Sequence, residues 1–229
     1  MNNSRSIDMV KGPLIKNVFL FYLPLMATNL LQMMFNAADT IVVGKFSGQV
    51  ALAAVGATGS LIYLLVSLFN GLSIGANVVI AKAIGSNDQT KITKSVNSSV
   101  MLALLSGIVL TLVGVFGSKY FLIWMGTPSS IIDQSTLYMQ VYFMGSLFMV
   151  MYNFGAAILR SQGDTKRPLI FLTISGVINV ILNLIFVIVF HWSVFGVSLA
   201  TVISQGIACI LVLYILVHDE DETHLELKH

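Results

Sequence analysis

The sequence predicts an all-α, polytopic membrane protein with six transmembrane helices. The chain has 229 residues, of which 56% are hydrophobic and 10% are charged, and its mean hydropathy is +0.89. A soluble domain carries roughly 25% charged residues. Such an apolar chain cannot cover a surface that faces water, which excludes a soluble enzyme, a nucleic-acid-binding protein and a disordered tail. Six apolar segments, each long enough for a spanning helix of about 20 residues, alternate with short polar breaks.

The six helices are expected at 18–44, 52–81, 96–116, 132–159, 168–190 and 197–217. The first contains Pro24, a candidate bend point, and the second and third are rich in glycine, which allows close helix contact. The fourth is rich in methionine, a flexible apolar side chain. Pro168 opens the fifth, where its missing N–H costs nothing because a first turn has no internal acceptor. The sixth contains Cys209, the single cysteine, which cannot form an internal disulfide.

The basic residues predict the orientation of this bundle. Residues 1–17 are expected to be a cytoplasmic N-terminal tail, 18–217 the transmembrane lobe, and 218–229 a cytoplasmic polar tail. With the N-terminus inside, ten of the twelve basic residues lie in cytoplasmic segments and two lie outside. The ten are Arg5, Lys11, Lys16, Lys82, Lys91, Lys94, Arg160, Lys166, Arg167 and Lys228, and the two are Lys45 and Lys119. The positive-inside rule therefore favours an N-in, C-in topology.

Asp39 is the one acidic residue well inside an expected helix. A carboxylate at the centre of a spanning helix costs about 2.5–3.5 kcal/mol on insertion scales, and charge inside a membrane is commonly functional. Asp39 precedes Lys45 by six residues, so it lies roughly 9 Å from the outer end of the helix. Asn29, Gln32 and Asn36 share its helix face. The pattern predicts a polar stripe that faces a water-filled cavity; the alternative is a hydrogen-bonded contact between helices.

Four other expected helices carry polar side chains at helical spacing. Helix 52–81 carries Tyr63, Ser67, Asn70 and Asn77, and helix 132–159 carries Tyr142 and Asn153. Helix 168–190 carries Ser175, Asn179 and Asn183, and helix 197–217 carries Ser198, Thr201 and Gln205. Taken singly, such residues are more often packing contacts than ligands. Taken together, they predict a polar bundle interior with one negative charge, and Gln32, Asn36, Asn70, Asn153 and Gln205 are the residues expected to line its cavity.

The sequence lacks the motifs that membrane enzymes need in their spanning helices. There is no His-Glu-x-x-His pair and no phosphate-binding glycine loop. One membrane carboxylate cannot form a catalytic dyad, and His191 lies at a helix end. The four histidines have no metal-ligand spacing within a helix, and no cofactor is expected. The chain is therefore predicted to be a transporter and not an enzyme.

Several short motifs, in order along nearly the whole chain, support a family resemblance. They are PLM at 24–26, NAAD at 36–39 with VG at 43–44, LAAVG at 52–56, GLSIG at 71–75, LRSQGDT at 159–165, Asn179 with Asn183, and GVSLAT at 196–201. With these motifs the chain resembles the N-terminal half of a multidrug and toxic compound extrusion (MATE) transporter. Residues 218–229 then lie where the loop to the second lobe would begin.

The resemblance implies one six-helix lobe of a two-lobed, twelve-helix antiporter that exports organic cations or drugs across the plasma membrane against an H⁺ or Na⁺ gradient. It also implies a coupling site made of Asp39, Asn179, Asn183 and Thr201, with Asn153 nearby. Many members of the family carry a second aspartate where this chain has Asn183, which halves the formal charge. Na⁺ at Asp39 is the one metal ion expected, since hard cations prefer oxygen ligands. The alternative is protonation, because burial favours a neutral carboxyl group.

The expected mechanism is coupled exchange, in which a proton or Na⁺ from outside neutralises Asp39 and helix 18–44 then repacks. The expected partners are the lipid bilayer, organic cations, and either a missing C-terminal lobe or a second copy of this chain; no nucleic acid is expected. Two alternatives stay open. One is a lipid-linked oligosaccharide flippase of the same superfamily, which would need basic residues in its cavity. The other is a truncated fragment that transports nothing.

Overall fold

The computed structural model describes residues 14–218, and these residues form seven α-helices and one short π-helix, with no strand in this range. The helices are α1 (Leu14–Phe46), α2 (Gly48–Gly85), α3 (Gln89–Trp124), α4 (Ile132–Met144), α5 (Ser146–Ser161), α6 (Lys166–Leu184), the π-helix η1 (Ile185–Val189) and α7 (Ser193–His218). Most of the predicted N-terminal tail, 1–17, and of the C-terminal tail, 218–229, lies outside the described residues.

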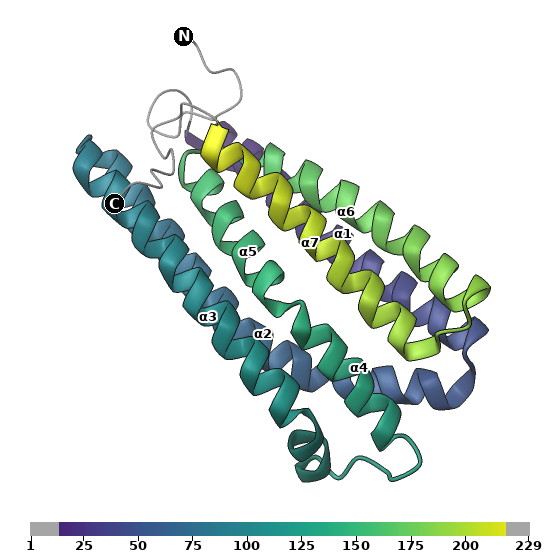
Figure 1. The fold of residues 1–229 in the computed structure, drawn as a ribbon. Helices are drawn as coiled ribbons and strands as arrows, with labels where there is room; N and C mark the ends of the chain where they lie inside the picture. The colour runs from purple at the N-terminus through teal and green to yellow at the C-terminus, as the bar shows by residue number, and fades with distance from the viewer. Residues whose placement is uncertain (1–13, 219–229) are drawn as a thin grey trace.

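Six membrane spans account for this arrangement. Five of the helical segments are long and apolar enough to cross a bilayer, and α4 and α5 together form a sixth span that is bent by 46°. The helices lie side by side along one common direction (Figure 1). The prediction of an all-α polytopic bundle with six spans is therefore confirmed.

The expected helix 132–159 is wrong in one respect, because the chain bends at Gly145 between α4 and α5. Val202 of α7 packs directly against this glycine, and a Cβ atom at position 145 would lie 2.6 Å from Val202 Cγ2. On the other side of the bend, the hydroxyl groups of Ser146 and Thr111 of α3 are 2.9 Å apart and share a hydrogen bond. Tertiary contacts with two neighbouring helices thus hold the bend, and hydropathy does not record them.

Most helices extend beyond their expected apolar segments. Helix α3 begins at Gln89 and ends at Trp124, whereas its apolar segment covers 96–116. Asp88 caps its N-terminus by accepting the Lys91 N–H at 3.2 Å, and its carboxylate is 3.1 Å from Lys91 Nζ. These hydrogen bonds from Lys91 hold the pKa of Asp88 below its usual value. Hydropathy predicts the part of a helix that lies in lipid, while capping groups decide where the helix begins.

The turns at the two ends of the bundle differ in charge. The α2–α3 and α5–α6 turns lie at the same end as the C-terminus of α7 (Figure 1). This end carries Lys82, Lys91, Lys94, Arg160, Lys166 and Arg167, whereas Lys45 and Lys119 lie toward the opposite end. We refer to the first as the basic end and to the second as the outer end, following the positive-inside rule.

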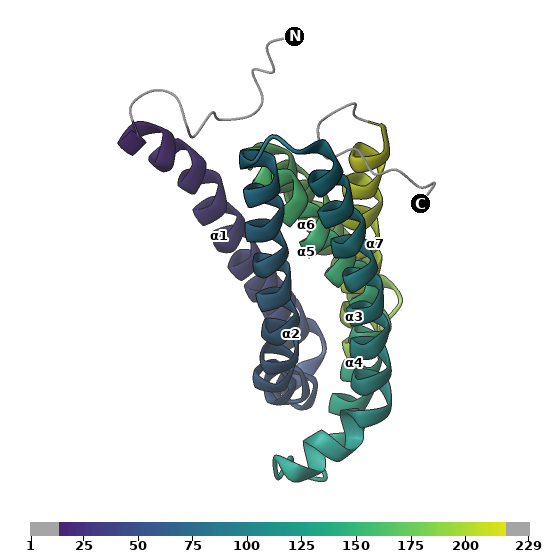
Figure 2. The same ribbon diagram turned by 90° about the vertical axis from the view of Figure 1, so that its left-hand side faces the viewer.

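Helix α1 is the least enclosed part of the lobe. It meets α2 at the turn around Ser47 and diverges from it toward the basic end (Figure 2). Most of its side chains are exposed, including the apolar Phe19, Met26 and Met33. Among its buried residues are Asp39, Val42 and Val43, all near the outer end. The carboxylate therefore lies where α1 packs most closely against the rest of the lobe.

Candidate functional site

Asp39 lies in the interior of the lobe, about two helical turns before the end of α1 at Phe46. Its side chain is 8% exposed and points toward α6 and α7. A carboxylate this deep in an apolar bundle needs hydrogen-bonding partners, because an unpaired buried charge is strongly unfavourable. Those partners come from residues at least 140 positions further along the chain.

Two asparagines of α6 and one threonine of α7 complete the network. Asn183 Nδ2 donates to Asp39 Oδ1, and it also donates to Asn179 Oδ1 at 3.2 Å. Asn179 Nδ2 in turn donates to Thr201 Oγ1 at 3.4 Å. Thr201 also lies beside the Asp39 carboxylate, and its hydroxyl donates to the Val197 carbonyl at 3.0 Å. The structure thus brings together the four residues of the expected coupling site, Asp39, Asn179, Asn183 and Thr201.

The amide of Asn183 can have only one orientation in this network. Both hydrogens of its nitrogen are used, one by Asp39 and one by Asn179. A flipped amide would point its oxygen at the Asp39 carboxylate, which is also an acceptor. The Asn183 oxygen consequently faces away, and it is buried without a hydrogen-bond partner in the described residues. A buried acceptor of this kind is a place for a water molecule, a proton donor or a cation.

Two tyrosines of α4 lie beside the carboxylate. Tyr138 and Tyr142 both interact electrostatically with Asp39, and their rings stack with centroids 6.3 Å apart. The Tyr142 hydroxyl donates to Met149 Sδ at 3.6 Å. The sequence indicated Tyr142 as a polar position but missed Tyr138, although their spacing of four residues places both on one helix face.

Among the described residues, none of the five residues expected to line a cavity hydrogen-bonds to Asp39. Gln32 and Asn36 are exposed on α1, and Asn70 of α2 is half-buried. Asn153 of α5 donates to the carbonyl of Met149 in its own helix at 3.0 Å. Gln205 of α7 is half-buried, and its side-chain oxygen lacks a hydrogen-bond partner in the described residues. On α1, the stripe divides into exposed amides and one buried acid.

Some polar residues of the other stripes serve packing. Asn77 of α2 donates to the carbonyl of Ala157 in α5 at 2.7 Å, which joins the two helices. The hydroxyls of Ser175 and Ser198 bond to carbonyls of their own helices. These residues follow the alternative interpretation, in which amides and hydroxyls satisfy one another within an apolar bundle.

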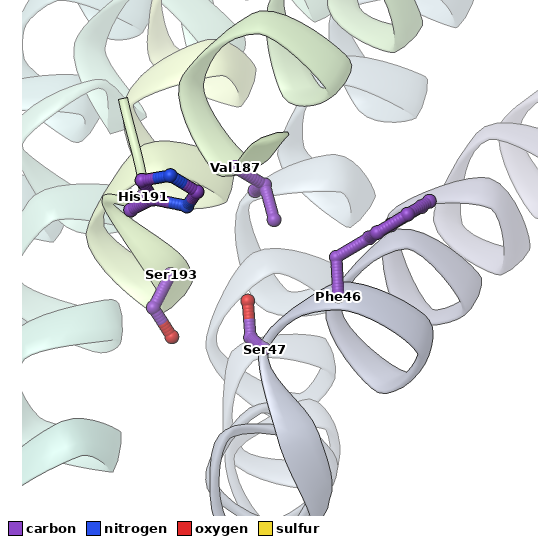
Figure 3. Close-up of a pocket in the computed structure, with 5 residues that line it drawn as sticks. All are labelled: Phe46, Ser47, Val187, His191 and Ser193. Atoms are coloured by element: carbon purple, nitrogen blue, oxygen red, sulfur yellow. The ribbon is translucent and has the colours of Figure 1, made fainter. Parts of the chain in front are cut away.

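A pocket of about 230 Å³ lies at the outer end of the lobe. Phe46, Ser47, Val187, His191 and Ser193 line it, and they come from the α1–α2 turn and from the segment between α6 and α7 (Figure 3). We call this the outer pocket. Sequence analysis missed it, because two turns that are far apart in the sequence form it together.

The fold and the site together define a multi-pass membrane protein with a polar hydrogen-bonded centre inside one bundle of helices. The MatE family model matches residues 24–185. The chain therefore belongs to the MATE family. This family consists of transporters, so the prediction that the chain is not an enzyme is confirmed.

Individual relatives agree with this membership. The chain is 30% identical over 213 residues to "Probable multidrug resistance protein YpnP" of Bacillus subtilis, an alignment that covers 93% of this chain and 48% of the relative. Among solved structures, it is similar to a multidrug resistance MATE family transporter of the MOP superfamily. The outward-facing conformation is matched with a TM-score of 0.90, at 25% identity, over all of this chain and 51% of that one. The inward-facing conformation is matched with a TM-score of 0.81, at 27% identity, over 86% of this chain and 45% of that one.

The chain spans about half the length of the curated relatives that it matches. It corresponds to one lobe of the solved MATE structures, as the resemblance implied.

Proposed function

We propose that this chain is one lobe of a cation-coupled antiporter that exports organic cations or drugs, and that Asp39 is the group that binds the coupling ion. The observation that carries the proposal is the hydrogen-bonded network of the buried Asp39, Asn179 and Asn183 with the half-buried Thr201. A carboxylate inside a spanning bundle is costly, and in membrane proteins such groups commonly mark ion or proton pathways.

The chemistry of the site suits a small cation or a proton. The Asp39 carboxylate, the Asn179 amide and the Thr201 hydroxyl supply oxygen atoms, which hard cations prefer. Either ion would cancel the negative charge and weaken the attraction between Asp39 and the Asn183 nitrogen. Helix α1 would then repack against α6, and this repacking is the coupling step. The ion shifts the equilibrium between the two packings of α1 only to the extent that its affinity for the two packings differs.

We propose the plasma membrane as its location, and several features favour a multidrug exporter. The relatives are named as multidrug resistance or multidrug export proteins. The exposed face of α1 carries polar residues, Asn29, Gln32 and Asn36, beside the methionines Met33 and Met34. Methionines adapt their shape to varied apolar ligands. The flippase alternative is less favoured, because an anionic substrate would meet a carboxylate at the polar centre.

Replacing Asp39 with asparagine tests this proposal. We expect Asp39→Asn to abolish export of a fluorescent organic cation driven by an imposed H⁺ or Na⁺ gradient in proteoliposomes. The matched control is Asp133→Asn, the same substitution at an exposed acid at the start of α4, and it should export normally. Undiminished export by Asp39→Asn would overturn the coupling role. The gradient that drives export in the unmodified chain identifies the coupling ion.

Because the chain spans half of its relatives, a second lobe is part of the proposal. Either a C-terminal lobe, in the same or another chain, or a second copy of this chain completes the transporter. Proteoliposomes that contain this chain alone distinguish the two. Export by this chain alone, together with a dimer that can be chemically cross-linked, supports a second copy. No export by this chain alone, followed by export when a C-terminal lobe is added, supports the C-terminal lobe. Loss of export in both preparations leaves the inert-fragment alternative as the answer.

A further inference from the structure

The outer pocket lies directly outward of the Asp39 network. Phe46 follows Asp39 by seven residues, His191 follows Asn183 by eight, and Ser193 precedes Thr201 by eight. Helices α1 and α6 run toward the outer end, whereas α7 runs away from it. All three offsets therefore point in one direction, from the buried network toward the outer pocket.

Three valines separate the pocket from the network, and each lies one helical turn outward of a network residue. Val43 follows Asp39 by four residues, Val187 follows Asn183 by four, and Val197 precedes Thr201 by four. They are 0%, 2% and 0% exposed, and they belong to one hydrophobic cluster. We call these three residues the valine layer. Val187 also lines the outer pocket, so the pocket and the layer share this side chain.

We propose that the outer pocket is the vestibule through which a proton or a small monovalent cation reaches Asp39, and that the valine layer is the barrier it must pass. This inference rests on the proposed function and adds the route of the ion. The hydroxyls of Ser47 and Ser193 and the ring of His191 supply polar groups in the pocket. The valine layer has no polar side-chain atom, and an apolar constriction blocks ions because water does not remain in it.

The backbone beside the barrier is irregular, which would let it move. Val187 lies in the π-helix η1, and π-helical turns are frequent at functional sites. The turn that follows contains two residues other than glycine in the left-handed region, His191 with φ 57° and Ser193 with φ 45°. Such conformations persist where surrounding structure enforces them, and they occur often at switching elements. A shift of η1 would move Val187 out of the layer without unfolding α6.

A flux measurement tests the barrier. Val187→Thr keeps the side-chain volume and places a hydroxyl in the valine layer, so it should raise passive H⁺ or Na⁺ flux into proteoliposomes by about tenfold, which corresponds to a barrier lower by about 1.4 kcal/mol. The matched control is Val212→Thr on α7, equally buried in a different hydrophobic cluster, which should not change the flux. Adding Asp39→Asn to Val187→Thr should remove the extra flux. An unchanged flux in Val187→Thr, or an equal rise in the control, would overturn the inference.

Thiol labelling tests the vestibule without any transport assay. Cys209 is the only cysteine, so Cys209→Ser gives a background free of thiols. A charged, membrane-impermeant thiol reagent is added on the outside and should label Ser193→Cys quickly. It should label Val187→Cys at least about tenfold more slowly, which corresponds to an additional barrier of about 1.4 kcal/mol. Adding Val43→Thr should speed labelling at position 187.

The labelling result separates the two proposals. If Ser193→Cys resists the external reagent while Asp39→Asn still abolishes export, the vestibule is wrong and the proposed function stands. If labelling follows the expected order while Asp39→Asn exports normally, the coupling role of Asp39 fails, and the outer pocket with the valine layer remains.

Discussion

Asp39 and Asn183 are 144 residues apart in the sequence and are joined by a direct hydrogen bond in the centre of the lobe. This bond connects α1, the least enclosed helix, to α6. Asn183 donates to the carboxylate and so offsets part of the free energy that is lost when the carboxylate is removed from water. It also links the carboxylate to Asn179 and Thr201. One side chain of α6 thereby joins α1 to the rest of the polar network.

Replacing Asn183 with alanine should destabilise the lobe. The substitution removes the donor to a buried carboxylate, and we expect a loss of about 1–2 kcal/mol, or a melting temperature lower by roughly 2–8 °C for a chain of this size. Thermal unfolding in detergent measures it. Asn153→Ala is the control, because that side chain bonds only to its own helix, and it should change stability less. An Asn183→Ala lobe as stable as the control would contradict the importance of the bond.

Gly114 should not tolerate a methyl group. A Cβ atom at this position of α3 would lie 2.1 Å from Cγ and 2.5 Å from Cβ of the fully buried Phe143 in α4. These atoms are near the backbone of Phe143, so rotating the ring does not relieve the clash. Gly114→Ala should cost about 1–3 kcal/mol, measured by thermal unfolding.

Gly75→Ala on α2 is the matched control for that substitution, because a Cβ atom there meets nothing within 4 Å. A methyl group in an open helical position should leave stability unchanged or raise it by up to about 1 kcal/mol through helix propensity. Equal effects of the two substitutions would show that the α3–α4 contact is looser than the structure has it.

Asp164 should be essential for the α5–α6 turn. It is 1% exposed, accepts the backbone N–H groups of Lys166 and Arg167 at 3.1 Å each, and pairs with the Arg167 side chain. Asp164→Ala should cost about 1–3 kcal/mol because buried donors lose their acceptor, and Asp164→Asn should cost less because its oxygen still caps the helix. Asp88→Ala, at an exposed cap, is the control. A larger loss for the asparagine variant than for the alanine variant would refute the capping role.

Glycine at position 193 should relieve backbone strain. Ser193 has a φ of 45°, in the left-handed region that costs a residue with a Cβ about 1–2 kcal/mol. Ser193→Gly should therefore raise stability by up to about 1 kcal/mol, or roughly 2–4 °C in melting temperature. Ser47→Gly is the control, since Ser47 has a φ of −110° and no strain to relieve, and it should lower stability slightly. Stabilisation by Ser47→Gly and not by Ser193→Gly would contradict the assigned strain.

Much of the fold could be predicted from composition and periodicity. Apolar segments of spanning length gave the six spans, because lipid admits only backbones that satisfy their own hydrogen bonds. The helix ends were predicted less well, since Asp88 caps α3 and the first residues of that helix are polar but still helical. The bend at Gly145 was missed, because its cause is the approach of Val202 from another helix.

The sequence alone determined that one carboxylate, Asp39, lies inside a spanning helix, and that Asn179 and Asn183 share a face of another. Helical spacing fixes which residues of one helix lie together, but it does not say how that helix is rotated or which neighbour it meets. Only the tertiary structure decided that Asp39 turns away from the exposed Gln32 and Asn36 to meet Asn183. It also decided that Val43, Val187 and Val197, each four residues from a residue of that site, pack in one hydrophobic cluster. The physical reason is that packing between helices sets both the rotation and the register, and these depend on contacts among residues far apart in the chain.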